Sequence, residues 1–263
     1  MCLHITKESK IMIEASQLCK QYGSLAAVNN LNLHVENELF VFLGPNGAGK
    51  TTTIKMMTGL LRPSSGSVKL GGFDIVTQPL KAKAILGLVP DTPILYDKLT
   101  AREFITFMGQ MYGIDRGTMQ KRLINLVELF DLTDRMDDLI QSFSHGMKQK
   151  VALAGALIHD PKILFLDEPT VGLDPKSARN LKDLLRGLVK KGTTVFMSTH
   201  ILEIAEAMCD RVGIIYEGQL AAYGTMDELR QKPEWQGQSL EDIFLQLTGN
   251  DDAQEVAKFL EEN

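Results

Sequence analysis

Several kinds of functional site are missing from this sequence of 263 residues. It has only three cysteines and no CxxC pair, so we expect neither a disulfide framework nor a zinc site, and a reducing cytosol fits best. Its five histidines are dispersed and form no HExxH pattern. The net charge of -5 argues against a surface that coats nucleic acid. Acidic residues gather at 131–138 and 251–262, and we interpret both runs as solvated helix faces.

Long apolar segments are missing too. The unbroken apolar runs stay short, such as VALAGALI at 151–158, whereas a membrane-spanning helix needs about 20 such residues. The first ten residues, MCLHITKESK, lack the apolar core of a signal peptide. We therefore expect a soluble chain, which would act at a membrane only through a partner.

The patterns that are present alternate between strands and helices. Strand patterns occupy 11–19, 31–35, 39–43, 66–70, 85–90, 162–168, 193–199 and 211–216. Helices are expected at 50–61, after Pro175, around 200–208 and near the C-terminus, with a loop at 234–238 around the single Trp235. From about 95 to 160 three helical patterns follow one another without a strand. This order predicts an α/β fold with a mostly parallel sheet and an inserted helical subdomain.

The segment GPNGAGKT at 44–51 matches the pattern GxxxxGK[ST] between an apolar strand and a helix. Its glycines allow successive backbone N–H groups to turn inward around an anion, and the helix start adds positive potential. Lys50 can reach the β- and γ-phosphates of a nucleotide, and the Thr51 hydroxyl can ligate Mg²⁺. The expected nucleotide-binding residues here are Gly44, Pro45, Asn46, Gly47, Ala48, Gly49, Lys50, Thr51 and Thr52.

The segment ILFLDE at 163–168 supplies two carboxylates for the same site. Asp167 ends a buried strand, where it can hold the Mg²⁺ shell, and Glu168 can orient or deprotonate the attacking water. The chain is thus expected to bind a nucleoside triphosphate and to hydrolyse it. Such loops occur in GTPases, kinases, helicases and transporters alike. The sequence has no NKxD-like stretch that would recognise guanine, which weakens the GTPase interpretation.

The stretch SFSHGMKQKVALAGALIHDPKILFLDEPTVGLD, from 142 to 174, resembles the signature-to-Walker-B region of ABC-type ATPases. FSHGM fills the signature position, VGLD at 171–174 the D-loop, and STH at 198–200 the switch-histidine position. The resemblance extends from about Ile13 to Gly224. It implies a P-loop ATPase core with an N-terminal antiparallel β portion, an ATPase domain at 11–224 and a C-terminal helical extension at 225–263.

The resemblance also decides between two interpretations of Ser144 and His145. Side by side they suggest a nucleophile and its base, but in the family the signature contacts the γ-phosphate of ATP held by another subunit. Ser144 and Gly146 retain the hydroxyl and the unobstructed N–H that this contact requires. His145 and Met147 depart from the usual Gly and Gln, and a simple helix N-cap remains the alternative role for Ser144.

Three further roles follow from the resemblance. Tyr22 matches an aromatic residue that stacks on adenine, with a turn aromatic as the alternative. His200 would hydrogen-bond the γ-phosphate and position the water beside Glu168. Asp91 replaces the usual Q-loop glutamine, so it is expected to serve the Mg²⁺ shell, with capping of the next turn as the alternative.

The resemblance implies an ATP-driven motor subunit that uses ATP and Mg²⁺. It would work with a separate transmembrane permease and a second ATPase subunit, at the cytoplasmic face of a bacterial membrane. The segments VPDTPILYDKLTARE and QSLEDIFLQLT resemble exporters of the multidrug and Ecs-like kind. The rival interpretations are a soluble ABC-type ATPase acting on nucleic acid or the ribosome, and a regulatory module that hardly hydrolyses ATP. The single cassette and the acidic balance disfavour nucleic acid.

Overall fold

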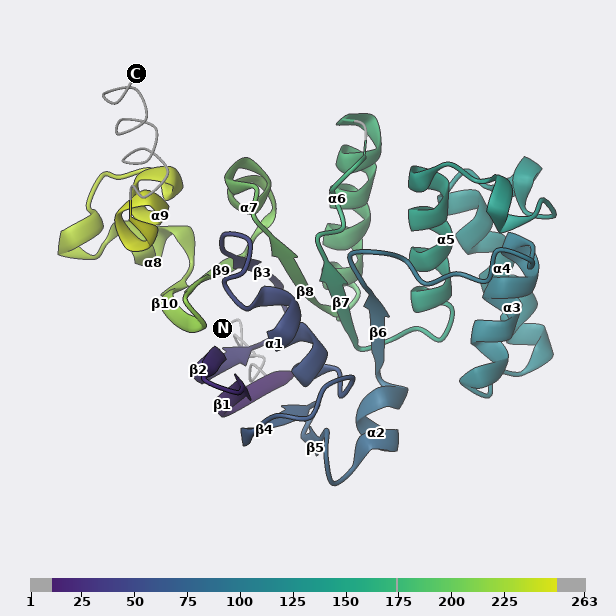
Figure 1. Cartoon of the computed structure of the whole chain (residues 1–263). Coiled ribbons are helices and arrows are strands. Elements are labelled where there is room, and N and C mark those ends of the chain that lie inside the picture. Colours follow the sequence, from purple (N-terminus) through teal and green to yellow (C-terminus); the bar gives the residue numbers. More distant parts are fainter. Residues whose placement is uncertain (1–10, 174, 250–263) are drawn as a thin grey trace, which may run out of the picture.

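The computed structural model describes residues 11–173 and 175–249 and contains two sheets (Figure 1). The larger sheet has six strands in the order β10-β9-β3-β8-β7-β6. Five of them are parallel, and β10 runs antiparallel to β9. Their bounds are β3 Leu39–Leu43, β6 Leu86–Val89, β7 Ile163–Asp167, β8 Thr194–Thr199, β9 Arg211–Tyr216 and β10 Gln219–Gly224. The mostly parallel sheet predicted from the alternating pattern is confirmed.

A second, antiparallel sheet has the order β2-β1-β4-β5. Its strands are β1 Ile13–Tyr22, β2 Leu25–Val35, β4 Ser65–Leu70 and β5 Phe73–Asp74. The expected N-terminal antiparallel portion is therefore present. The strand predicted at 31–35 begins earlier, at Leu25, and β5 was not predicted.

The side chains of β3 point alternately to the two faces of the larger sheet, and this explains how the two sheets pack. Successive side chains of a strand point to opposite faces. Phe40 and Phe42 pack in one apolar cluster with residues of β1, β2, β4 and α1 (Lys50–Met57), where their rings also meet Phe196. Leu39, Val41 and Leu43 belong to the cluster on the other face. All five residues of β3 are buried, as a continuous apolar strand covered on both faces requires.

The segment between β6 and β7 is helical, as predicted. It contains α3 (Ala101–Met111), α4 (Arg116–Leu129), α5 (His145–Leu157) and two 3₁₀ turns at Thr133–Arg135 and Ile140–Ser142. Residues 95–160 contain no strand, and one isolated β-bridge joins Thr100 to Leu139. Thr100 and Glu103 form a capping box that starts α3.

Helix α1 is shorter than its sequence pattern suggests. The predicted helix at 50–61 ends at Met57, because Gly59 takes a positive φ of 68° and the N–H groups of Gly59 and Leu60 turn back to the carbonyls of Met56 and Lys55. The other helices of the core are α2 (Pro79–Ala84), which was not predicted, α6 (Pro175–Lys190) and α7 (Leu202–Met208).

The segment after Gly224 is tightly joined to the core. It contains α8 (Met226–Arg230), a 3₁₀ turn at Pro233–Trp235 and α9 (Leu240–Thr248). The connection expected around Trp235 is present as a short turn before α9, and this residue is 5% exposed, with its indole packed into the same apolar cluster as Ile243. Burying so large an apolar side chain fixes the connection as a buried turn.

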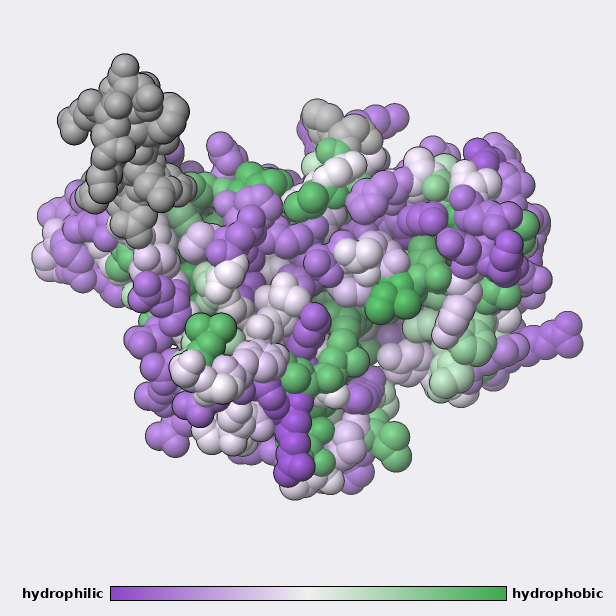
Figure 2. Space-filling view, in the orientation of Figure 1, coloured by the Kyte–Doolittle hydropathy of each residue, from purple (hydrophilic) through white to green (hydrophobic). Residues whose placement is uncertain are grey.

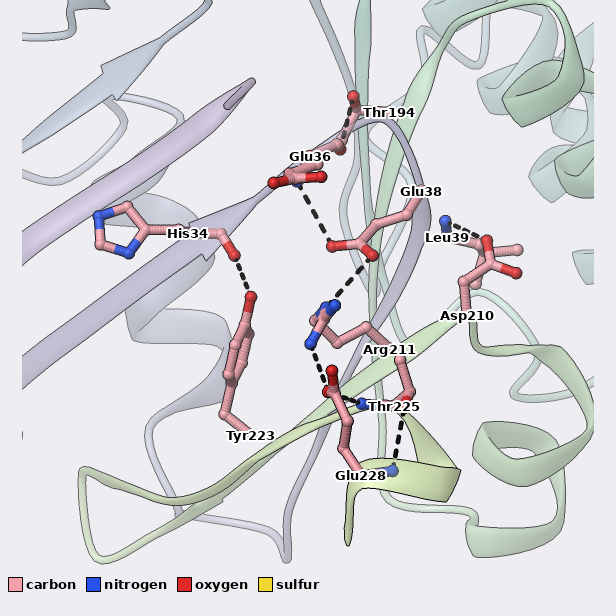
Figure 3. Close-up of polar contacts among 10 residues, drawn as sticks. All are labelled: His34, Glu36, Glu38, Leu39, Thr194, Asp210, Arg211, Tyr223, Thr225 and Glu228. Atoms are coloured by element: carbon pink, nitrogen blue, oxygen red, sulfur yellow. Dashed lines mark hydrogen bonds and ion pairs between the residues drawn. The ribbon is translucent and has the colours of Figure 1, made fainter. Parts of the chain in front are cut away.

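An ion-pair network also anchors this segment (Figure 3). Arg211 on β9 contacts Glu38 at 3.3 Å and Glu228 of α8 at 2.7 Å. Burial raises the pKa of Glu38, which the charge of Arg211 partly offsets. The Tyr223 hydroxyl donates to the His34 carbonyl at 2.6 Å, joining β10 to the antiparallel sheet. In 11–173 and 175–249 we find no helix with the length and apolar character of a membrane span.

Candidate nucleotide-binding site

The loop at 44–49 joins β3 to α1 and can only be built with glycines at certain positions. A Cβ on Gly44 would lie 2.5 Å from the Ile215 carbonyl oxygen, and one on Gly49 would lie 2.5 Å from that of Ala27. Gly49 also has a φ of 105°, which residues with a side chain rarely adopt. The close packing against two neighbouring strands therefore fixes the curved path of this loop.

Helix α1 presents its N-terminus to the space enclosed by the loop. Its N-cap residue, Gly49, has no side chain that could accept a hydrogen bond from the first N–H groups, and its first turn contains no acidic residue. The first N–H groups of a helix have no partner within the helix, so this end favours an anion. The Lys50 ammonium lies at the same end and donates to the carbonyls of Gly44 at 2.7 Å and Pro45 at 3.1 Å.

Glu168 lies between two cationic or hydrogen-bonding side chains. Its Oε1 is 3.3 Å from Lys50 Nζ, and its Oε2 is 3.1 Å from Nδ1 of His200. Lys50 is 6% and Glu168 14% exposed, so this contact is shielded from water. Glu168 has a positive φ of 49°, a conformation that costs energy in a residue with a long side chain and is found at functional sites.

Asp167 is buried at the end of β7, with 2% of its surface exposed. Ser198 on β8 donates to its Oδ1 at 2.5 Å, and the Thr51 hydroxyl also hydrogen-bonds to it. Burial raises the pKa of Asp167, the two hydroxyls lower it, and the charges of Asp91 and Glu168 raise it further. A buried carboxylate beside a hydroxyl and two more carboxylates offers hard oxygen donors that a divalent cation would neutralise.

These donors fit Mg²⁺ as an ion that also binds phosphate oxygens. In 11–173 and 175–249 no three His, Cys, Asp or Glu side chains are arranged as a ready-made metal site. Mg²⁺ characteristically uses one or two carboxylates and completes its shell with phosphates and water. The Thr51 hydroxyl and Asp167 suit this mode of binding.

Ser198 is a site residue whose role the sequence patterns did not reveal. It donates to Asp167 and accepts a hydrogen bond from the Glu168 N–H at 3.1 Å. The register between the parallel strands pairs Asp167 with Ser198, which places one hydroxyl under both carboxylate residues. Its position two residues before His200 is the only sequence signal that could have indicated it.

Tyr22 and Asp91 lie at the margin of this arrangement. Tyr22 ends β1 with half of its surface exposed, and Lys20 Nζ lies 5.2 Å from its ring centroid. Asp91 follows β6, is exposed, and accepts a hydrogen bond from the Thr92 N–H at 2.7 Å. Asp91 thus caps the next residue, and its charge raises the pKa of Asp167, whereas its service to the Mg²⁺ shell stays a prediction.

Ser144 is the N-cap of α5, and it accepts a 3.4 Å hydrogen bond from the Met147 N–H. Gly172 packs beside His145, because a Cβ on Gly172 would lie 3.0 Å from the imidazole. The expected signature and the segment 171–173 are therefore neighbours, whereas Asp174, the last residue of the expected D-loop, lies outside the described residues.

The N-terminus of α5 lies away from the loop at 44–49. The loop follows β3, whereas α5 packs beyond β6, at the far edge of the sheet (Figure 1). The order β3-β8-β7-β6 separates these strands by three inter-strand steps, or about 14 Å. Ser144 and Gly146 are thus not brought together with Lys50 in this chain.

Known proteins are similar to this chain in sequence and in fold. The model of the ABC transporter family matches residues 28–171. The chain belongs to the ABC transporter family. It is 41% identical over 219 residues to the linearmycin resistance ATP-binding protein LnrL of Bacillus subtilis, covering 83% of this chain and 70% of the relative. It is 35% identical over 241 residues to the ABC-type transporter ATP-binding protein EcsA of the same organism, covering 91% and 98%.

The fold of this ABC transporter chain is also that of a solved ATP-binding subunit. The two structures agree with a TM-score of 0.86 and 33% identity, covering 90% of this chain and 100% of the other. The resemblance to bacterial ABC subunits, including the Ecs-like kind, is therefore confirmed. The chain is an ATP-binding subunit with ATPase activity, of the kind that works with a membrane permease.

Proposed function

We propose that this ABC transporter subunit drives export through a separate membrane permease, from the cytoplasmic face of a bacterial membrane. The observation that carries the motor part is the contact of Glu168 with both Lys50 and His200. The direction of transport rests on relatives such as LnrL, whose name records resistance to linearmycin. Resistance to a toxic compound is a typical result of export.

The residues of this chain divide the work of hydrolysis as follows. Lys50 and the N-terminus of α1 hold the β- and γ-phosphates, and the loop from Gly44 to Thr52 surrounds them. Tyr22 stacks on adenine with its exposed ring. Binding of the phosphates exchanges the contacts of Lys50 with Glu168 and two carbonyls for contacts with phosphate oxygens.

Glu168, once it no longer pairs with Lys50, accepts the proton of the attacking water as the general base. His200 holds the Glu168 carboxylate from the other side, where it would also contact the γ-phosphate. Thr51 and Asp167, helped by Asp91, are the ligands that would hold Mg²⁺. When bound, Mg²⁺ neutralises charge on the phosphates and stabilises the charge that develops during transfer.

A second ATPase chain completes the site in this proposal. Ser144 and Gly146 lie too far from the loop at 44–49 of their own chain to contact the same nucleotide. They start α5, whose N-terminus favours an anion. A partner chain that supplies its own Ser144 and Gly146 would close over the γ-phosphate, and hydrolysis would release this closure.

The permease binds, in this proposal, to the surface between the sheet and the helical subdomain. Ile94 and Tyr96, in the loop between β6 and α3, are 83% and 55% exposed. Figure 2 shows hydrophobic groups gathered over this loop among polar surroundings. An exposed apolar patch with a polar rim is typical of a protein-binding surface. Asp91 lies in the same loop, so docking here can reach the Mg²⁺ ligands.

A pull-down from the membranes of the chain's own host tests the proposal. The tagged Glu168→Gln chain, extracted in mild detergent with ATP and Mg²⁺, should recover a polytopic membrane protein. The double variant Ile94→Asp/Tyr96→Asp should recover less of it while still binding ATP. Recovery of ribosomes or nucleic acid instead, with the chain in the soluble fraction, would overturn the proposal.

A further inference from the structure

One buried hydroxyl links the two acidic residues of the nucleotide site. It belongs to Ser198, which lies on β8 and is completely buried. Its Oγ donates to Oδ1 of Asp167 at 2.5 Å and accepts a hydrogen bond from the backbone N–H of Glu168 at 3.1 Å. The parallel register pairs Ser198 with Asp167, so this link is built into the sheet and does not depend on a loop.

The direction of both hydrogen bonds follows from the chemistry of the groups. A backbone N–H can only donate, and an ionised carboxylate can only accept. A serine hydroxyl has one proton and two lone pairs, so Ser198 gives its proton to Asp167 and receives that of the Glu168 N–H. The three groups form a short chain in which each hydrogen bond polarises the next. The Ser198 hydroxyl is therefore held from both sides in one orientation.

The backbone of Glu168 needs such a partner. Its φ of 49° lies in the left-handed region, which residues with a side chain rarely adopt. Glu168 also precedes Pro169, and a proline restricts the backbone of the residue before it. Strained conformations of this kind persist only where the surrounding structure holds them. Here the Glu168 N–H donates to Ser198, and the Glu168 carbonyl accepts from the Val171 N–H at 3.2 Å.

The backbone conformation of Glu168 determines where its carboxylate lies. Oε1 is 3.3 Å from Lys50 Nζ and Oε2 is 3.1 Å from His200 Nδ1, so a rotation of this backbone would move the carboxylate away from both. A general base must lie within about 2.6–3.2 Å of the group whose proton it accepts. Misplacement of a catalytic group by about 1 Å can lower the rate about 100-fold. The Glu168 N–H is therefore the group through which Ser198 can affect hydrolysis.

We propose that Ser198 is a positioning residue for ATP hydrolysis. By accepting the Glu168 N–H, it keeps the Glu168 carboxylate aligned with the attacking water, and it contacts neither the water nor the nucleotide itself. Its bond to Asp167 turns the hydroxyl so that a lone pair faces the Glu168 N–H. This role rests on the function of Glu168 as the general base, which is proposed above.

Ser198→Ala removes the hydroxyl and keeps most of the volume of the side chain. At saturating ATP and Mg²⁺ we expect kcat for hydrolysis to fall about 10- to 100-fold, as the loss of a group that orients a site residue typically causes. The KM for ATP should stay unchanged, because in this proposal Ser198 makes no contact that holds the nucleotide. Phosphate release measures both constants, and a cooperative melting transition shows that the variant is folded.

Thr194→Val is the matched control on the same strand. Thr194 is buried too, and its hydroxyl donates to the Glu36 carbonyl at 3.0 Å, at the opposite end of β8 from the site (Figure 3). This variant also loses one buried hydrogen bond, but it should hydrolyse ATP at the normal rate. An equal fall in kcat for Thr194→Val and Ser198→Ala would overturn the proposal, since a general weakening of β8 would then explain the loss.

The double variant Glu168→Gln/Ser198→Ala tests whether Ser198 acts through Glu168. Once the base is lost its alignment no longer matters, so adding Ser198→Ala should slow single-turnover hydrolysis much less than it does in the unaltered chain. A further fall of about 10- to 100-fold, the full effect expected of Ser198→Ala alone, would contradict the proposal, because Ser198 would then act by a separate route.

Three further outcomes distinguish a failure of this role from a failure of the proposed function. If excess Mg²⁺ restores the normal kcat of Ser198→Ala, Ser198 serves Asp167 as a metal ligand and its proposed role is wrong. If Ser198→Ala hydrolyses ATP normally while Glu168→Gln is slow, the role of Glu168 stands and that of Ser198 is excluded. If Glu168→Gln itself hydrolyses ATP at the normal rate, the proposed function of Glu168 fails, and the role of Ser198 fails with it.

Discussion

His200 Nδ1 lies 3.1 Å from Oε2 of Glu168, although the two residues are separated by 32 positions. Each residue directly follows the end of a parallel strand, Glu168 after β7 and His200 after β8. Neighbouring parallel strands end at the same edge of the sheet, so the register of β7 and β8 is what creates this contact.

The Glu168→Gln substitution should lower the rate of ATP hydrolysis while ATP still binds. An amide cannot accept the proton of the attacking water, and loss of a general base costs about 10²- to 10⁴-fold. Phosphate release measures the rate, and a fluorescent ATP analogue measures binding. Glu14→Gln is a matched control, because Glu14 lies on β1 of the antiparallel sheet and is not one of the assigned site residues. It should leave the rate of hydrolysis and the binding of ATP unchanged. A Glu168→Gln chain that hydrolyses ATP at the normal rate would exclude the assigned role.

Asp91 is expected to affect the Mg²⁺ requirement. Asp91→Ala should raise the Mg²⁺ concentration that gives half-maximal hydrolysis by about tenfold, as the loss of an outer-shell partner does. Asp91→Gln, which introduces the amide usual in the family, should show a smaller change. The measurement is a titration of Mg²⁺ at saturating ATP. An unchanged Mg²⁺ dependence in both variants would leave Asp91 only its hydrogen bond with the Thr92 N–H.

Asp167→Asn should stabilise the fold while it abolishes hydrolysis. Burial raises the pKa of Asp167, so the folded state binds a proton more tightly than the unfolded state does. Stability therefore falls as the pH rises from the pKa of the unfolded carboxyl to the higher pKa of the folded one, and the cost is complete above both values. The amide removes this cost and keeps acceptors for Ser198 and Thr51.

Thermal melting without nucleotide or Mg²⁺ measures this effect. A gain of about 1 kcal/mol would raise the melting temperature by roughly 2–4 °C in a chain of this size. The gain should shrink below the pKa of an ordinary aspartic acid, where the carboxyl is neutral in both states. A lower melting temperature for Asp167→Asn at neutral pH would contradict the prediction.

His159 is expected to make stability depend on pH. Its ring stacks on Tyr112 with centroids 3.6 Å apart, its Nε2 contacts the Leu86 carbonyl at 3.0 Å, and burial lowers its pKa. The unfolded state therefore binds a proton at His159 more tightly than the folded state does. The contribution of the neutral imidazole to stability is complete above the pKa of the unfolded histidine, and it is lost as the pH falls below that value.

His159→Phe keeps the stacking on Tyr112 but cannot titrate. Between about pH 7 and about pH 5, where histidine titrates, its melting temperature should fall less than that of the unaltered chain. His34→Phe, on the antiparallel sheet, controls for the loss of a histidine elsewhere. Equal pH dependence in the unaltered chain and His159→Phe would show that the buried imidazole is not responsible.

The local elements of the core could be predicted from the sequence. Runs such as LFVFL at 39–43 and ILFLD at 163–167 are apolar at every position because both faces of these strands are buried. The loop at 44–49 could be predicted for the same local reason, since glycines, a lysine and a threonine at fixed spacing have few alternative uses. Trp235 shows where this approach stops, because its place in a turn does not reveal that its indole packs in the apolar cluster of the core.

The sequence alone thus predicted most of the strands, the loop proposed to bind phosphates and most of the residues proposed to carry the chemistry, but neither β5 nor the role of Ser198. Only the tertiary structure decided the strand order, which brings Glu168 to His200 and Ser198 to Asp167 and keeps Ser144 away from the loop at 44–49. The physical reason is that periodicity records whether a residue is buried, whereas pairing between distant segments depends on how whole elements pack.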